Sequence, residues 1–255
     1  MKMPILFIGH GSPMNAIENN EFTENWDNIL NNIPKPKGIL AISAHWYTRH
    51  TRINVEEAPK TIYDMFGFPD ELYQIKYERK TNNEFINEIK EIDSTIIGDN
   101  SWGYDHGIWS IFHRTNISKE IPVIEMSIDG YKTPKEHYEL GKKLGKLREK
   151  GYLIVASGNI VHNLALVDFY KSDGFKWATK FDDEIKNAII ENDIEKILDY
   201  KKIPNKDKAF KTDEHFLPLL YILGAKSDTD NGFIFNNSTI LGALSMTSYM
   251  FKENS

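Results

Sequence analysis

Three short apolar segments of the chain each lead into a histidine. Residues 5–9 precede His10, residues 39–44 precede His45, and residues 153–158 lead through Asn159 to His162. Each segment is rich in branched apolar residues and too short for a globular helix, so each is predicted to be a buried strand. Parallel strands of α/β proteins open their ligand crevice at their carboxyl ends. Because neutral imidazole is a common ligand of zinc and iron, the pattern predicts a metalloenzyme.

A fourth histidine, His215, lies in the segment Asp213-Glu-His-Phe-Leu-Pro218. A helix that begins near Glu214 would tolerate Pro218, because the N–H groups of its first turn are unpaired. The positive end of that helix would keep His215 neutral and able to bind a metal. Taken singly, a histidine in such a position could simply be bonded to a backbone carbonyl. Four at the ends of elements, in a chain with eight histidines, favour a shared site.

His106 lies in the segment Trp102-Gly-Tyr-Asp-His-Gly107, ahead of a helix predicted at residues 108–113. Its glycine-flanked, aromatic setting suits a proton-transfer residue that contacts substrate. The segment also suits a helix cap in which Asp105 binds backbone N–H groups and His106 is incidental. The remaining histidines fall on predicted polar or amphipathic faces and are expected to be incidental; they are His50, His113 and His137.

Patterns of strands and helices alternate along the chain, which is typical of the α/β class. Further strands are predicted near residues 95–97, 122–128, 233–235 and 239–251, and helices near residues 22–33, 85–92, 140–147, 177–200 and 215–223. An irregular stretch rich in aromatic residues, 48–80, is predicted to be a functional loop, because long irregular segments in compact domains usually are. The basic and polar residues 201–211 are expected to form a solvated loop.

The composition restricts the class of protein. With 40% hydrophobic and 27% charged residues, residues 1–255 are expected to form one globular domain. A net charge of −6 argues against a nucleic-acid partner. The absence of cysteine excludes disulfides and thiolate ligands, so a metal must be bound by histidine, carboxylate or water. Without a signal peptide or an apolar span, we expect a cytoplasmic protein with no membrane partner, either a monomer or a small homo-oligomer.

Five segments of the chain together resemble motifs of the extradiol aromatic ring-opening dioxygenases. They are Gly9-His-Gly-Ser-Pro-Met-Asn15, Ser43-Ala-His-Trp46, Trp102-Gly-Tyr-Asp-His-Gly107, Ala156-Ser-Gly-Asn-Ile-Val-His-Asn-Leu164 and Glu214-His-Phe-Leu-Pro-Leu-Leu220. The resemblance is to the protocatechuate 4,5-dioxygenase superfamily, and within it to the 4,5-DOPA dioxygenase branch. It implies a single α/β domain, a central, mostly parallel mixed sheet flanked by helices, and one divalent metal ion at the strand ends.

The resemblance also implies roles for individual residues. By position, His10, His45 and His215 are similar to metal ligands. His162 resembles either a fourth ligand or an acid–base histidine, and His106 resembles a substrate-contacting acid–base residue. The wider superfamily uses two histidines and a glutamate, whereas this chain has His215 beside Glu214 at the third position. A site made only of histidines suits Zn(II) as well as Fe(II).

Three functions are compatible with these residues. The first is an extradiol dioxygenase that uses Fe(II) for activity and opens the ring of a catechol, such as 4,5-DOPA, with O2. Trp46 and Tyr104 are then expected to wall the flat apolar ring, together with Trp102 and the loop of residues 63–68. The second is a zinc hydrolase at the same site, in which the metal activates water. The third is a non-catalytic binding protein of the same fold.

Overall fold

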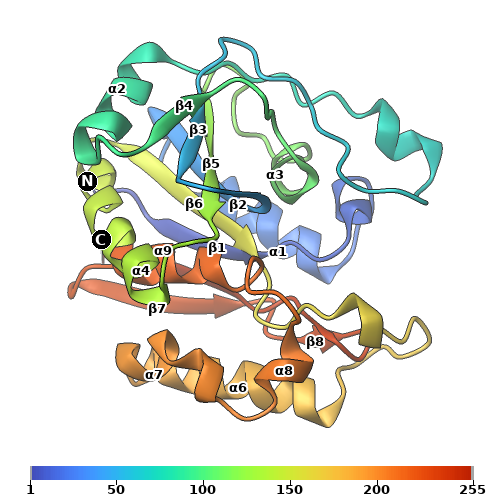
Figure 1. Cartoon of the computed structure of the whole chain (residues 1–255). Helices are drawn as coiled ribbons and strands as arrows, with labels where there is room; N and C mark the ends of the chain where they lie inside the picture. Colours follow the sequence, from blue (N-terminus) through green and yellow to red (C-terminus); the bar gives the residue numbers. More distant parts are fainter. Residues whose placement is uncertain (1, 254–255) are drawn as a thin grey trace.

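One sheet of eight strands dominates the computed structural model, which describes residues 2–253. Its strands are β1 (Ile5–Gly9), β2 (Gly38–Thr48), β3 (Arg52–Asn54), β4 (Ile97–Asp99), β5 (Val123–Asp129), β6 (Tyr152–Gly158), β7 (Asp230–Phe235) and β10 (Ser248–Glu253). The order across the sheet is β4-β3-β5-β2-β6-β1-β10-β7, and β8 (Thr239–Ile240) pairs separately with β9 (Leu244–Ser245) (Figure 1).

Helices connect and cover these strands. The α-helices are α1 (Glu21–Leu30), α2 (Asn83–Ile92), α3 (His106–Phe112), α4 (Pro134–Leu144), α5 (Lys146–Glu149), α6 (Lys176–Ile190), α7 (Ile194–Leu198), α8 (Lys206–Ala209) and α9 (Leu217–Ala225). Short 3-10 turns are η1 (Pro13–Ala16), η2 (Asp70–Gln74), η3 (Leu164–Leu166) and η4 (Tyr200–Lys202). Within residues 2–253, no helix has the length and apolar character needed to cross a membrane.

The four central strands are parallel and buried on both faces. β5, β2, β6 and β1 pair in parallel, whereas β10 pairs antiparallel with β1 and β3 pairs antiparallel with β5. In β1, Ile5 and Phe7 enter one core and Leu6 and Ile8 enter the other. A strand covered on both faces needs apolar residues at every position, which explains the continuous apolar runs. The predicted α/β domain with a mostly parallel mixed sheet is confirmed.

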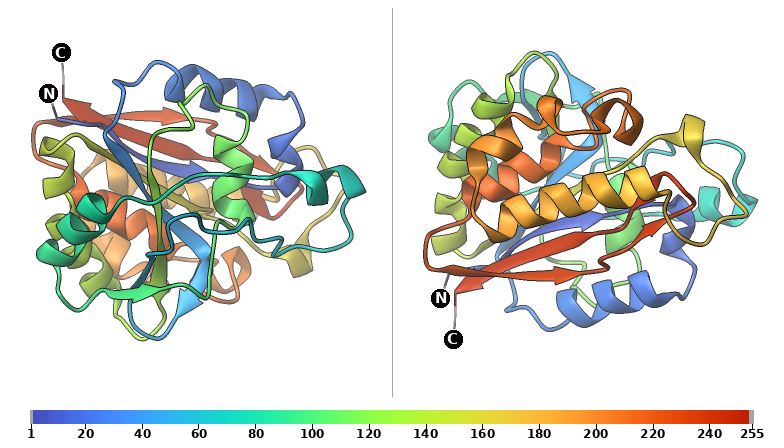
Figure 2. Two further views of the ribbon diagram at one scale, coloured as in Figure 1. Left: turned by 90° about the horizontal axis from the view of Figure 1, so that it is seen from above. Right: turned by 90° about the horizontal axis from the view of Figure 1, so that it is seen from below.

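The two cores lie on opposite faces of the sheet. One core receives apolar residues of α2, α4, α6 and α9, and the other receives those of α1 and α3. The views of Figure 2 show α1 and α6 on opposite sides of the strands. The parallel strands therefore lie between helical layers, and their carboxyl ends are free to carry a site.

Residues 176–198 form two helices rather than the single long helix that their spacing predicts. Asn192 adopts a left-handed backbone conformation with φ of 55°, which a right-handed helix cannot accommodate. The side chain of Asp193 then accepts a hydrogen bond from Lys196 N and begins α7. The prediction was wrong at this interruption.

The segment of residues 201–211 is also more ordered than predicted. It contains α8, and Ile203, Ala209 and Phe210 are buried in the core. Ala209 O accepts a hydrogen bond from His162 N at 2.8 Å. This segment is therefore not a solvated loop, because it holds the backbone of a candidate site residue.

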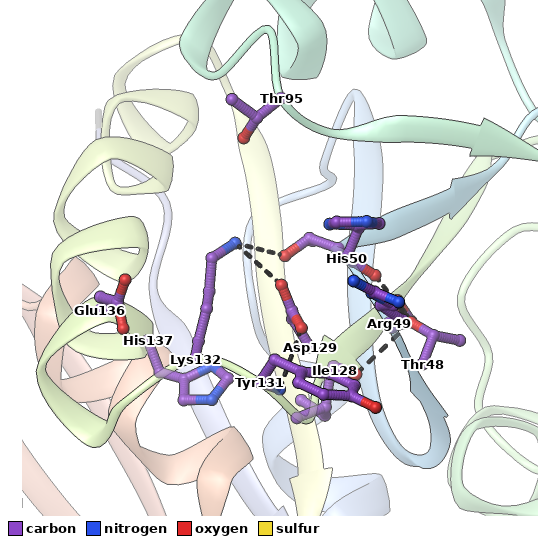
Figure 3. A network of polar contacts seen from close by, with 12 residues as sticks. Thr48, Arg49, His50, Thr95, Ile128, Asp129, Tyr131, Lys132, Glu136 and His137 are labelled. Atoms are coloured by element: carbon purple, nitrogen blue, oxygen red, sulfur yellow. Dashed lines mark hydrogen bonds and ion pairs between the residues drawn. The ribbon is translucent and has the colours of Figure 1, made fainter.

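Polar contacts fasten the loops that follow β2 and β5 (Figure 3). Lys132 Nζ donates to Thr51 Oγ1 at 2.8 Å and lies 3.7 Å from Asp129 Oδ2. The backbone N–H of Tyr131 donates to Asp129 Oδ1 at 3.1 Å. Tyr47 Oη donates to Gly130 O at 3.4 Å. These contacts fix the carboxyl ends of two adjacent strands, including the end of β2 that carries His45.

Candidate metal centre and active-site cavity

Five histidines from distant parts of the chain meet at the carboxyl ends of the parallel strands. His10 follows β1, His45 lies in β2, His106 begins α3, His162 follows β6, and His215 precedes α9. The ring centroid of His45 lies 4.8 Å from that of His10, 4.0 Å from that of His106 and 5.1 Å from that of His215. One potential ligand atom from each of His10, His45 and His106 lies within 4.8 Å of the others.

The proton on His10 is placed by its neighbours. Ser157 Oγ donates to Gly107 O at 2.6 Å, so this hydroxyl is free only to accept from His10 Nδ1, 2.9 Å away. The other ring nitrogen, Nε2, therefore keeps its lone pair. That atom is buried and has no hydrogen-bond partner among residues 2–253. Burial, with the neighbouring histidines, lowers the pKa of His10 well below its usual range, so the ring stays neutral. An unpartnered buried lone pair fits a metal ligand.

Asp64 joins two of the histidines. Its Oδ2 lies 2.9 Å from His45 Nδ1, and its Oδ1 lies 3.0 Å from His106 Nδ1. Burial opposes ionisation of Asp64, but the hydrogen bonds from His106 and His45 outweigh burial and hold its pKa well below the usual range. A carboxylate behind the Nδ1 atom of a histidine fixes the ring orientation and directs the Nε2 lone pair elsewhere, as in known metal sites.

His45 and His215 face each other through their Nε2 atoms, which are 3.1 Å apart. Two nitrogens at this distance need either a proton between them or a cation that both contact. His215 Nδ1 lies 3.4 Å from Glu214 Oε1, so Glu214 turns its carboxylate toward the far side of the His215 ring. The ring centroid of His10 lies 4.8 Å from that of His45 and 5.4 Å from that of His215, so nitrogens of all three rings are candidates for a shared ion.

A close approach of backbone brings His215 against the sheet. Asn159 N donates to His215 O at 2.8 Å, and a Cβ on Gly158 would lie only 2.3 Å from that oxygen. Gly158 is therefore required for this packing.

α9 begins at Leu217 rather than near Glu214. Burial, followed by the neighbouring histidines, lowers the pKa of His215 well below its usual range, so its neutrality arises from burial rather than from the helix end.

His162 stacks on His215. The ring centroids are 3.6 Å apart and the ring planes differ by 5°. The two rings therefore lie face to face, so His162 would have a role different from that of His215 if His215 held a metal ion. Burial, with a contribution from His45, lowers the pKa of His162 to about 3, so the ring is neutral at pH 7.

A cavity of about 1010 Å³ opens onto these rings. Its histidines are His45, His106, His162 and His215, and its apolar lining comes mainly from Met65, Phe66, Phe68, Leu164, Val167, Phe169 and Leu244. Phe66 is 92% exposed and Phe169 is 82% exposed. Lys211 and Glu214 are among its charged residues. The cavity is large enough for a single-ring aromatic molecule and is apolar over much of its wall.

Trp46 and Tyr104 do not line this cavity. Trp46 is 3% exposed and stacks on Trp102 with centroids 6.2 Å apart. Tyr104 is fully buried and donates through its hydroxyl to Val123 O at 2.7 Å. Their positions do not support direct contact with substrate. Trp102, expected beside them, does not line the cavity either, whereas Met65, Phe66 and Phe68 of the loop of residues 63–68 do.

A buried carboxyl pair lies behind the histidines. Trp102 Nε1 donates to Glu125 Oε1 at 3.1 Å and to Asp105 Oδ2 at 3.2 Å, and Ser43 Oγ donates to Asp105 Oδ1 at 2.7 Å. Asp105 therefore does not cap α3 with its side chain. Burial, and then the Asp105 carboxylate, raises the pKa of Glu125 well above its usual range, which favours its neutral form.

The sequence patterns did not identify Asp64 or Glu125 as site residues. Glu125 could have been noticed, because it is a charged residue in the middle of the apolar run of β5, where both faces are buried. Asp64 offered none, because it lies in an irregular stretch without periodicity. The histidine expected to be incidental at position 137 is fully buried, and its Nδ1 lies 2.8 Å from Tyr221 Oη, away from the site.

Comparison with known proteins identifies several full-length similarities. Residues 4–251 match a family described as the catalytic LigB subunit of aromatic ring-opening dioxygenase. An Escherichia coli K12 protein named 4,5-DOPA dioxygenase extradiol is 37% identical over 97% of this chain and 94% of its own length. A Beta vulgaris protein of the same name is 34% identical over 96% of this chain and 95% of its own length. A crystal structure of an uncharacterized Escherichia coli K12 protein superimposes with a TM-score of 0.85 at 33% identity, covering 98% of this chain and 99% of that protein.

Proposed function

The chain belongs to the LigB family of aromatic ring-opening dioxygenases, and we propose that it opens a catechol ring with O2 at a histidine-bound divalent metal ion. The family match and the named relatives confirm the family that the motifs indicate and the class of extradiol ring-cleaving dioxygenase. One observation supports the metal dependence most directly: the buried Nε2 atom of His10 has no hydrogen-bond partner among residues 2–253. In the same cluster of rings, the Nε2 atoms of His45 and His215 face each other.

We assign His10, His45 and His215 as the ligands of the ion. Each can present Nε2 while its Nδ1 atom faces an oxygen of Ser157, Asp64 or Glu214. When bound there, Fe(II) would supply the redox chemistry that lets O2 react with a catechol, whereas Zn(II) cannot exchange electrons.

His162 and His106 are proposed to move protons. His162 stacks face to face on His215, which favours a role other than that of a ligand, and burial leaves its ring neutral. His106 has Asp64 on its Nδ1 side, 3.0 Å away, so its Nε2 atom is free to exchange a proton with a catechol hydroxyl.

The cavity is proposed to hold a catechol that carries a polar side chain. Met65, Phe68 and Leu244 supply apolar surface for the ring, and Lys211 and Glu214 supply charges of both signs. A catechol with an amino-acid side chain, of the kind named for the relatives, would present a carboxylate and an ammonium group to these charges.

Turnover of a panel of catechols tests the proposal. The protein is loaded with Fe(II) without oxygen, exposed to air and substrate, and followed by absorption of the ring-opened product. A matched sample loaded with Zn(II) serves as the control. We expect product only from the Fe(II) sample. Failure with every catechol would contradict the proposal, and oxygen-independent hydrolysis by the Zn(II) sample would favour the hydrolase instead.

A further inference from the structure

A second cavity of about 610 Å³ lies apart from the histidine site and shares no lining residue with it. Its walls come from three segments, and the lining residues are Ala58, Pro59, Lys60, Thr61, Tyr63, residues 76–80, Lys119 and Glu120. The volume lies in the range typical of small-molecule sites. None of its residues has a place in the proposed chemistry.

The lining of this second cavity is basic although the chain carries a net charge of −6. Five of its residues are basic and two are acidic. Lys80 pairs with Glu57 outside the cavity, with Nζ 3.1 Å from Oε1. Among residues 2–253, no carboxylate pairs with Lys60, Lys76 or Lys119. A concave wall with unneutralised positive charge concentrates anions.

Two buried polar groups indicate a built site rather than a chance gathering of surface lysines. Arg79 is 5% exposed, and its guanidinium donates to Ile117 O at 3.0 Å and to Ser118 O without pairing with a described carboxylate. Tyr77 is 3% exposed, and the Arg79 guanidinium lies over its ring, with Cζ 5.2 Å from the ring centroid. A buried cation without a counter-charge is costly, and an anion in the cavity would supply that charge.

A short segment separates this cavity from the metal site. Tyr104 N donates to Lys60 O at 2.8 Å, and Ile62 N donates to Tyr104 O at 2.7 Å. Trp109 Nε1 donates to Ile62 O at 2.9 Å. Two residues after Ile62, Asp64 contacts His45 and His106. Residues 60–64 therefore line the second cavity at one end and hold the candidate site at the other.

We propose that the second cavity binds a small organic anion bearing a phosphate or several carboxylates. Its charged end lies toward Arg79 and the lysines, and its apolar part lies against Pro59 and Tyr63. The bound anion braces residues 60–64 and so steadies Asp64. The inference stands apart from the proposed activity, because it concerns binding and is measured without turnover.

Calorimetric titration of the full chain, loaded with Zn(II), tests the site. The probes are inorganic phosphate, which tests charge alone, and phenyl phosphate, which adds an apolar part. The double variant Lys76→Met/Lys119→Met removes two exposed charges from the lining, and Lys35→Met, an exposed lysine elsewhere, is the matched control. We expect phenyl phosphate to bind more tightly than phosphate, and the double variant to bind it about tenfold more weakly than the control.

The remaining outcomes overturn the proposal. The proposed site would be contradicted if the unmodified chain showed no saturable binding of phenyl phosphate. It would also be contradicted if the double variant bound phenyl phosphate as tightly as the Lys35→Met control. Binding of inorganic phosphate with no gain from the phenyl group would make it a site for the free ion. Hydrogen exchange provides the second readout: bound phenyl phosphate should slow exchange at the amides of Ile62 and Tyr104. Unchanged exchange at both amides would contradict the bracing of residues 60–64.

Discussion

The chemistry of the site depends on which ring nitrogen of each histidine carries a proton. The Nδ1 atom faces Ser157 in His10, Asp64 in His45 and Glu214 in His215. These oxygens favour a proton on Nδ1 and leave Nε2 available, which is how proteins commonly orient metal-binding histidines. A change at one of these oxygens should therefore affect the metal without removing a ligand.

The role of His162 can be separated from metal binding. In His162→Gln we expect the metal content to stay at the unmodified level, because the ring stacked on His215 is not among the proposed ligands. Turnover should fall about 100-fold, as for loss of an acid–base group. Metal analysis and steady-state kinetics on the same sample measure both effects. Loss of metal in this variant would assign His162 as a ligand.

Lys211 should affect substrate choice. It lines the active-site cavity and forms no ion pair with another described residue. In Lys211→Met we expect KM for DOPA to rise about tenfold, with KM for unsubstituted catechol unchanged, because only DOPA carries a carboxylate. Lys208→Met, an exposed lysine outside the cavity lining, is the control. An equal change for both substrates would rule out carboxylate recognition by Lys211.

At the scale of residues, the sequence predicted the histidines better than their partners. His10, His45 and His162 could be found because each follows an apolar strand, and parallel strands end at one edge. Asp64 could not be found, because its contacts depend on how an irregular segment returns to the sheet. Trp46 and Tyr104 were expected at the substrate because they are aromatic, but that property equally suits their buried positions.

At the scale of elements, the loop before α3 depends on a close contact with residues 60–64. A Cβ on Gly103 would lie 1.9 Å from Lys60 O, so an added methyl group must displace one of the two backbones. Both segments lead to the site, through His106 and Asp64 respectively.

Gly103→Ala should therefore affect both stability and activity. We expect the free energy of unfolding to fall by about 1–3 kcal/mol through overpacking, and turnover to fall roughly tenfold to hundredfold through displacement of His106. Urea unfolding and steady-state kinetics measure these effects. Asn100→Ala, an exposed position in the same loop, is the control. Full activity in Gly103→Ala would show that this contact does not position the site.

The elements themselves were predicted unevenly. The central strands were found because burial on both faces makes them continuous apolar runs. The prediction of one long helix at residues 177–200 was wrong at Asn192. The periodic apolar residues continue past this position, but its left-handed backbone conformation separates α6 from α7. Residues 201–211 were predicted to be a solvated loop because they are rich in lysine. That prediction overlooked Ile203, Ala209 and Phe210, which are buried in the core.

At the scale of the whole molecule, buried neutral histidines should make the fold sensitive to acid. Burial is the main cause that lowers the pKa of His137 from 6.5 to about 4. The unfolded chain then binds a proton that the folded chain does not, so stability is lost as pH falls from about 6.5 toward 4. The loss attributable to this residue approaches about 3 kcal/mol below that window.

The variant His137→Gln isolates this contribution. We expect its free energy of unfolding to fall less between pH 7 and pH 5 than that of the unmodified chain, because the variant has no imidazole to protonate at this position. Urea unfolding at the two pH values measures the difference, with His50→Gln, an exposed histidine, as the control. Identical pH dependence in the unmodified chain and His137→Gln would contradict the assignment.

The order of the strands could not be predicted from local patterns. β10, at the end of the chain, lies between β1 and β7, and β3 pairs with β5 rather than continuing the parallel set beside β2. Such pairings depend on which distant segments cover each other, whereas apolar periodicity reports only that a segment is buried. The fold class could be predicted without the strand order, because alternating strands and helices already indicate the α/β class.

Titration with Fe(II) in the absence of oxygen tests most directly whether His10, His45 and His215 hold one ion. The unmodified chain should bind one Fe(II) per chain, and His10→Ala, His45→Ala and His215→Ala should each lose that binding. His106→Ala and His162→Ala should retain it. Binding that survives in His215→Ala but is lost in His106→Ala would instead select the group of His10, His45 and His106, and would contradict the proposed ligand set.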